Sequence, residues 1–174
     1  MSKRDLKKYL AGLTKEQLEE QFTTLYEKFS EVKTYYDFVF NPKEEKLIGV
    51  ARAKIANEYF PVKSKRPKLR RSVAQKYIKH FITLGVDPIA LADLMLFTIE
   101  TAQRFSAKRE MKYASFYKSI QTAYEQAVNY IIANGLAADY RVRVLAIAEE
   151  AKRQYWENQY EFERLGETIG FLED

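Results

Sequence analysis

The sequence contains no cysteine and a single histidine, His80. Without cysteine the chain forms no disulfide, thiolate nucleophile or cysteine-ligated metal site. One histidine excludes a zinc site built from several histidines and the di-iron pattern of two Glu-x-x-His motifs. The glycines are isolated from one another, so there is no glycine-rich loop for phosphate. These absences exclude the chemistry of many enzyme classes, and we expect no catalytic residue, no metal and no cofactor.

Glycine and proline are also scarce, with six glycines and four prolines in 174 residues. An all-β protein of this length needs more turn-forming residues than that. Hydrophobic residues make up 47% of the sequence and aromatic residues 14%, which is enough to form a packed core. The composition therefore predicts a folded, helical protein.

Long hydrophobic runs are missing as well. The longest nearly uncharged apolar stretch, Pro88 to Ile99, is interrupted by Asp93 and is much shorter than the ~20 residues that span a bilayer. The N-terminus is charged and has no apolar segment of the kind found in signal peptides. We therefore expect no contact with a membrane and a cytoplasmic location.

The apolar residues that are present follow helical spacing along most of the chain. Capping boxes are readable at Ser2–Asp5, Thr14–Gln17 and Ser72–Gln75, and Asp87-Pro88 is a strong helix start. Helices are expected near residues 3–12, 15–29, 32–40, 42–59, 72–84, 89–105, 112–133 and 139–166. This predicts an all-α fold of seven or eight antiparallel helices, arranged as a helical bundle or a short α–α superhelix.

We expect one helical domain over residues 1–174. In it a basic linker, 61–71, separates an N-terminal part, 1–60, from a C-terminal part, 72–166. The helix at 89–105 is apolar nearly all round over its first twelve residues, so it should be central. The stripe Leu18, Phe22, Leu25, Tyr26 and Phe29 should face a core.

Thirteen tyrosines suggest base stacking, as in proteins that bind single-stranded nucleic acid. However, several of them fall on the apolar stripes of predicted helices, and a core position is the more ordinary interpretation for these: Tyr77, Tyr113, Tyr117, Tyr124 and Tyr155. Tyr35, Tyr36 and Tyr140 are less well explained by periodicity.

Two ionisable side chains stand beside apolar residues. His80 lies near the end of its predicted helix, where a protonated imidazole interacts favourably with the helix dipole, so a structural role is expected. Asp93 has apolar neighbours on both sides and should be at least partly buried. A buried carboxylate needs a cationic partner, for which Arg71, Lys76, His80 and its own helix are candidates. An ion pair is favoured over a catalytic acid.

Acidic residues are absent from Pro61 to Val86, and this window carries eight Lys and Arg side chains. Because the net charge is +5, the rest of the chain carries −3. Cations before the N-terminus of a helix oppose its dipole, so fold stability does not explain them. A bound phosphate would reverse this penalty. The predicted anion-binding residues are Lys63, Lys65, Arg66, Lys68, Arg70, Arg71, Ser72 and Lys76.

The expected partner of this segment is a nucleic acid or the ribosome, contacted by a non-catalytic binding module. Two alternatives remain open. The segment is a solvated linker without a partner, or the protein is an interaction scaffold that docks an acidic protein.

Three segments carry a resemblance to known proteins: Tyr35 to Pro42, Arg71 to Tyr77, and Leu84 to Pro88. With these segments the chain resembles a bacterial family of uncharacterised helical proteins, found mainly in Bacteroidetes. The likeness covers roughly residues 1–165. It implies a bacterial, cytoplasmic, helical domain, and it implies no activity and no site residues.

Overall fold

A computed structural model of the chain describes residues 2–64, 66–109 and 111–170. These residues form nine α-helices and no strand, which confirms the all-α prediction with a slightly higher helix count. The chain divides into two compact units, Met1–Lys43 and Glu44–Asp174. The basic segment 61–71 therefore connects two helices of the second unit.

The first unit contains α1 (Lys3–Ala11), α2 (Lys15–Lys28) and α3 (Ser30–Phe40). The two capping boxes at its helix starts, Ser2–Asp5 and Thr14–Gln17, form as predicted. However, no described residue of these helices is buried, so the expectation that the Phe22 stripe faces a core is wrong. Phe22 packs edge-on against the ring of Tyr36, with 5.0 Å between centroids, but a unit this small covers such side chains only in part.

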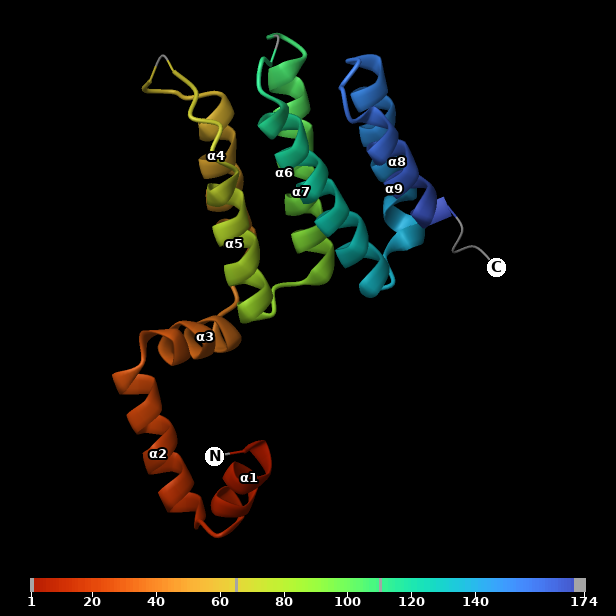
Figure 1. Cartoon of the computed structure of the whole chain (residues 1–174). Helices are drawn as coiled ribbons and strands as arrows, with labels where there is room; N and C mark the ends of the chain where they lie inside the picture. Colours follow the sequence, from red (N-terminus) through yellow and green to blue (C-terminus); the bar gives the residue numbers. More distant parts are fainter. Residues whose placement is uncertain (1, 65, 110, 171–174) are drawn as a thin grey trace. The chain divides into compact units, whose positions relative to one another are not determined.

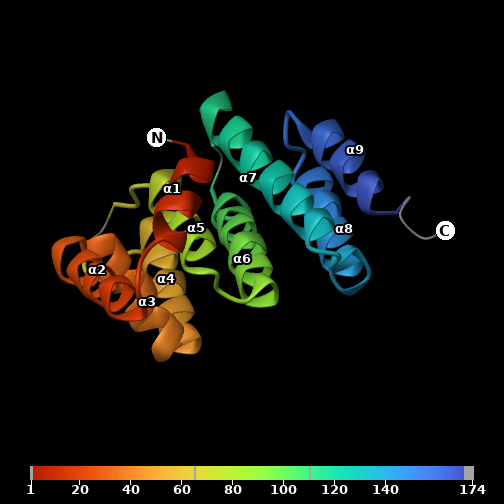
Figure 2. The same cartoon turned by 90° about the horizontal axis from the view of Figure 1, so that it is seen from below.

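The second unit is a row of three helical hairpins, which Figures 1 and 2 show side by side in chain order. They are α4 (Glu44–Tyr59) with α5 (Arg71–Leu84), α6 (Pro88–Ser106) with α7 (Ala114–Ala133), and α8 (Ala137–Arg153) with α9 (Gln159–Gly170). Helix α6 packs against both α4 and α8, and α7 packs against α9. This layering of successive hairpins is the arrangement found in α-solenoids.

Helix α6 is the centre of the second unit, as its sequence predicts. It packs against four helices, α4, α5, α7 and α8, and eleven of its nineteen residues are buried. Asp87 caps its start by accepting hydrogen bonds from the backbone N–H groups of Ile89 and Ala90. Gly85 ends the preceding helix at φ 72°, a backbone conformation that glycine adopts without strain.

Two predicted helix boundaries are wrong. Ser72 does not cap α5, because the helix already begins at Arg71 and its N-cap, Arg70, makes no side-chain capping bond. Asn41 ends α3, and α4 begins three residues later at Glu44.

The last predicted helix, 139–166, is in fact two helices. Helix α8 ends at Arg153 with two backbone hydrogen bonds, from Tyr155 N to Lys152 O and from Trp156 N to Ala151 O. This is the bonding of a Schellman motif, which reverses the chain when the residue at its C′ position has positive φ. Tyr155 occupies that position at φ 52°. Because glycine is the usual residue there, the sequence gives no signal for the turn.

Candidate anion-binding site

Three loops of the second unit lie at the same end of the hairpins (Figure 1). Loop 60–70 joins α4 to α5, loop 107–113 joins α6 to α7, and loop 154–158 joins α8 to α9. We call this end the hairpin tips. The predicted basic segment forms most of the first loop, so the tips are the place to look for an anion-binding surface.

The first loop is held by a buried acid at the end of α4. Glu58 is 6% exposed and accepts two side-chain hydrogen bonds from Arg70, at 2.8 and 2.9 Å. The Glu58 carbonyl oxygen also accepts the backbone N–H groups of Lys68 and Leu69. The bonds from Arg70 keep the pKa of the Glu58 carboxyl below its ordinary value. The expectation that no local acid neutralises the segment is therefore wrong for Arg70.

Arg71 also differs from its predicted role. Its side chain is half-buried against Tyr59, and it donates a hydrogen bond to Gln126 of α7. Burial lowers the pKa of Arg71, while Tyr59 acts in the opposite direction. The position at the base of the loop explains both facts, because α5 must pack on its neighbours from its first residue. Arg70 and Arg71 thus help to hold the loop in place.

The remaining cations of the segment are exposed. Lys63, Arg66 and Lys68 have no acidic partner among the described ion pairs, whereas Lys65 lies outside the described residues. Ser64 shapes this part of the loop, because its hydroxyl accepts the backbone N–H of Arg66. The loop therefore presents its charge to solvent at its outer end, away from the Glu58 pair.

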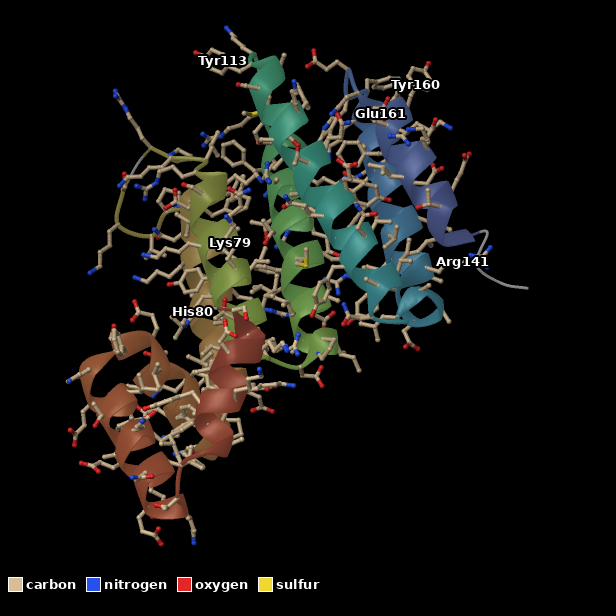
Figure 3. The ribbon with its side chains drawn as sticks, turned by 60° about the horizontal axis from the view of Figure 1, so that its bottom comes forward. Lys79, His80, Tyr113, Arg141, Tyr160 and Glu161 are labelled. Atoms are coloured by element: carbon tan, nitrogen blue, oxygen red, sulfur yellow. The ribbon has the colours of Figure 1, made fainter. Side chains whose placement is uncertain are left out.

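The positive surface continues along α5. Ser72, Lys76, Lys79 and His80 are all exposed, and they follow one another at helical spacing on one side of the helix. Figure 3 shows Lys79 and His80 on this helix. His80 is accordingly a surface residue, in ring contact with Phe81 at 5.9 Å.

The second loop adds cations that the sequence interpretation missed. Lys108, Arg109 and Lys112 are exposed on loop 107–113. A pocket of about 420 Å³ lies between the first two loops, and Lys108 and Arg109 line it together with Phe60, Pro61 and Phe105. The Arg109 guanidinium lies 5.1 Å from the centroid of the Phe105 ring, which supports it from below. The signal was present in the sequence as a group of closely spaced cations between two predicted helices.

The third loop contributes little free charge. Arg153, at its start, pairs with Glu150, and Lys152 pairs with Glu163 of α9. A second pocket, of about 570 Å³, separates this loop from loop 107–113 and is lined by Arg109, Tyr155 and Glu157 among others. The free positive charge of the tips is thus concentrated on the first two loops.

A sequence model of a family of unknown function, DUF6155, matches residues 1–170. The chain belongs to this family. The match includes both compact units and all three loops of the hairpin tips, so the site lies within the family's shared region. No curated protein and no solved structure matches the chain. DUF6155 membership confirms the expected resemblance to an uncharacterised family.

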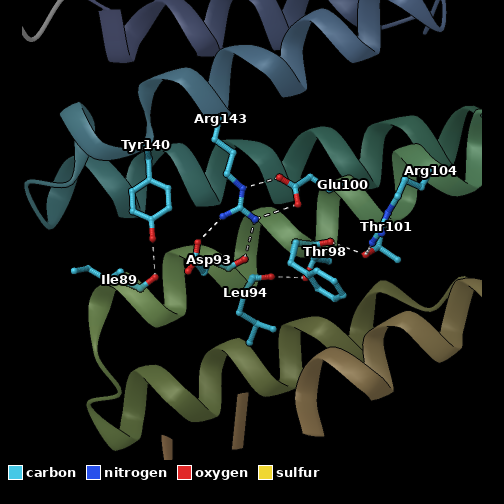
Figure 4. Close-up of polar contacts among 10 residues, drawn as sticks. Ile89, Asp93, Leu94, Thr98, Glu100, Thr101, Arg104, Tyr140 and Arg143 are labelled. Carbon is cyan, nitrogen blue, oxygen red and sulfur yellow. Dashed lines mark hydrogen bonds and ion pairs between the residues drawn. The ribbon is translucent and has the colours of Figure 1, made fainter. Parts of the chain in front are cut away.

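Asp93 has a different partner in this DUF6155 protein from any that we expected. Its carboxylate is partly buried and pairs with Arg143 of α8, which also forms two hydrogen bonds to Glu100 at 2.6 and 3.1 Å (Figure 4). Glu100 is the main cause of the raised pKa of Arg143. The prediction of a cationic partner holds, but the partner comes from α8 because that helix packs along α6. The cluster is an inter-helix contact.

Within the part of the DUF6155 chain that the structure describes, no group of three or more His, Asp or Glu side chains is placed to hold a metal ion. None of the described helices is long and apolar enough to cross a membrane. The hairpin tips therefore remain the best candidate for a functional site.

Proposed function

We propose that this protein is a non-catalytic module that binds nucleic acid through the hairpin tips, in the cytoplasm of a bacterium. The observation that supports the proposal best is the meeting of two cationic loops at one end of the second unit. The exposed cations come from two separate segments of the sequence but lie on neighbouring loops: Lys63, Arg66, Lys68, Lys108, Arg109 and Lys112.

A phosphate backbone suits such a surface for two reasons. Its charges repeat along a line, and the cations of the two loops, continued by Lys76 and Lys79 along α5, are likewise spread over an extended surface. In addition, the acid nearest to the first loop, Glu58, is already paired with Arg70 and does not neutralise the outer cations. A solvated linker would not need a buried acid and a bidentate arginine to fix its base.

The proposal is tested by measuring affinity for a fluorescently labelled 20-nucleotide RNA across a salt series. Replacing Lys63, Arg66 and Lys68 with Gln should weaken binding. It should also reduce the slope of log K against log salt by about 0.7 to 0.9 for each phosphate that the variant no longer neutralises. Arg70 and Arg71 are kept, because their replacement would disturb the loop itself.

The matched control removes the same charge elsewhere, by changing Lys28, Lys43 and Lys46 to Gln. These lysines are exposed and lie away from the hairpin tips, in the first unit and at the start of α4. The control should leave the salt slope nearly unchanged. If the parent protein binds neither RNA nor DNA at low salt, or if both triple variants weaken binding equally, the proposal is wrong.

A second function, that of a protein-interaction scaffold, is supported by the first unit. Its apolar side chains, Phe22, Leu25, Phe29 and Phe40 among them, are exposed. Such side chains are typical of surfaces that bind other proteins. The discriminating experiment is capture from a nuclease-treated lysate. A protein partner held by apolar contacts should stay bound at high salt and should no longer be captured when Phe22 and Phe40 are changed to Ser.

A further inference from the structure

Exposed tyrosines gather at the hairpin tips. Among the described residues of the second unit, three tyrosines are exposed: Tyr113 and Tyr160 at 73% and Tyr155 at 88%. All three lie at the end where the loops lie, and Figure 3 shows Tyr113 and Tyr160 there. The sequence pattern placed Tyr113 and Tyr155 in the core, which is wrong because each stands just beyond the end of its helix. Their clustering at one end is what requires an explanation.

Tyr113 occupies a position where its side chain does nothing for the helix that follows. It is the N-cap of α7, with extended backbone, and it makes no side-chain capping bond. Ser, Thr, Asp or Asn at this position would satisfy a free N–H group and stabilise the helix. The tyrosine neither caps the helix nor buries its ring, so helix stability does not account for it.

Tyr155 stands at a position where the backbone disfavours it. Its φ of 52° is in the left-handed region, which glycine and asparagine adopt far more readily than a bulky side chain does. Its ring is almost fully exposed, so packing does not compensate for the strain. Strained backbone that is not explained by packing is characteristic of functional sites.

The surroundings of the two rings indicate what they contact. Tyr113 follows directly on Lys108, Arg109 and Lys112 in the second loop. Tyr155 lines the pocket that faces the same loop, where Arg109 is also found. Exposed aromatic rings beside cations are the combination that single-stranded nucleic acids require, with bases stacked on the rings and phosphates paired with the cations.

We infer that Tyr113 and Tyr155 are stacking platforms for unpaired bases, so that the hairpin tips bind single-stranded RNA or DNA in preference to duplex. This inference rests on the proposed nucleic-acid function and adds the class of ligand. In a duplex the base faces are already stacked on one another and are inaccessible to a side chain. The basic loop 60–70 contacts the backbone of the strand, and the two tyrosines contact its bases.

The test compares a labelled 20-nucleotide single strand with a 20-base-pair duplex, for the parent and for the double variant Tyr113→Asn/Tyr155→Gly. Each replacement suits its backbone position better than tyrosine does, so the melting temperature should rise. Affinity for the single strand should fall by about ten-fold or more, because stacking on a protein ring contributes about 1–3 kcal/mol per base. Affinity for the duplex should change little. The control pair Tyr113→Phe/Tyr155→Phe keeps both rings and should bind the single strand as the parent does.

A second measurement needs no variant. An oligonucleotide containing 5-iodouridine is irradiated in complex with the parent protein, and the crosslinked residues are identified by mass spectrometry. Crosslinks at Tyr113 or Tyr155 support the inference, and crosslinks confined to other residues overturn it. Equal affinity for single strand and duplex, with no effect of the double variant, overturns the stacking role and leaves the proposed function in place. Absence of any nucleic-acid binding by the parent overturns both.

Discussion

At the scale of single residues, Glu58 has the largest effect on the candidate site. It is the one acid among the buried residues of the described chain, and it fixes the base of the basic loop through Arg70 and through two backbone N–H groups. The pair neutralises one cation of the segment and orients the others outward. The charge that remains free for a partner is therefore smaller than the sequence indicates, and it is better ordered.

The pairing of Glu58 predicts a specific dependence of stability on pH. Because the folded-state pKa of Glu58 lies below the ordinary 4.5, its contribution to stability is present above about pH 4.5 and disappears as the pH falls through the folded-state value. Glu58→Gln should lower the free energy of unfolding by about 1–2 kcal/mol at neutral pH. It should also flatten the acid limb of the stability curve, measured by urea denaturation between pH 3 and pH 7.

Glu167→Gln serves as the control, since this glutamate of α9 is exposed. It should leave the acid limb of the stability curve as it is in the parent. An acid limb that is identical in Glu58→Gln and in the parent would show that the pair contributes nothing to folding.

At the scale of elements, the turn between α8 and α9 is held by Gln154. The Gln154 side-chain oxygen accepts hydrogen bonds from Ser106 at 2.7 Å and from the indole of Trp156 at 3.1 Å, and its Nε2 donates to the Gln103 carbonyl. Trp156 is buried against the rings of Phe116, Tyr117 and Phe162. These contacts tie the third loop to the end of α6 and compensate for a turn that no glycine supports.

Replacing Gln154 with Ala should therefore destabilise this end of the molecule. The buried indole N–H of Trp156 would then have no acceptor, and we expect a cost of about 2 kcal/mol, measured by thermal unfolding. Trp156 is the single tryptophan of the chain, so its fluorescence reports on this turn. The emission should shift to longer wavelength in Gln154→Ala. The neighbouring change Arg153→Ala should leave the emission where it is, because that side chain is exposed. A matching shift in both variants would argue against a specific role of Gln154.

At the scale of the whole molecule, the hydrophobic core belongs entirely to the second unit. Every buried residue in the described part of the chain lies between Ile48 and Ile169. The three hairpins share this core through α6, whose neighbours include helices of all three. The second unit thus meets the main physical requirement for folding by itself, whereas the first unit does not.

A fragment comprising residues 44–174 should therefore fold without the first 43 residues. We expect a helical circular dichroism spectrum and a single cooperative unfolding transition, with a melting temperature within a few degrees of that of the full chain. A peptide of residues 1–43 should be only partly helical in water, because it has no buried residue among those described to stabilise its helices. A fragment 44–174 that unfolds without cooperativity would show that its core depends on the first unit.

The sequence by itself determined the helical class, most helix boundaries and the central position of α6. These features depend on local capping residues and on the spacing of apolar side chains, which are properties of neighbouring positions in the chain. The break at Tyr155 escaped detection because the apolar spacing continues across it and the turn lacks its usual glycine.

Only the tertiary structure decided which side chains are accessible to a partner. The pairing of Asp93 with Arg143 joins positions 50 residues apart, and the meeting of loops 60–70 and 107–113 joins segments that are also far apart in the sequence. Periodicity cannot reveal such contacts, because they follow from how the hairpins pack. For the same reason Arg70 and Arg71 became part of the fold, while Lys108, Arg109, Tyr113 and Tyr155 joined the exposed surface of the hairpin tips.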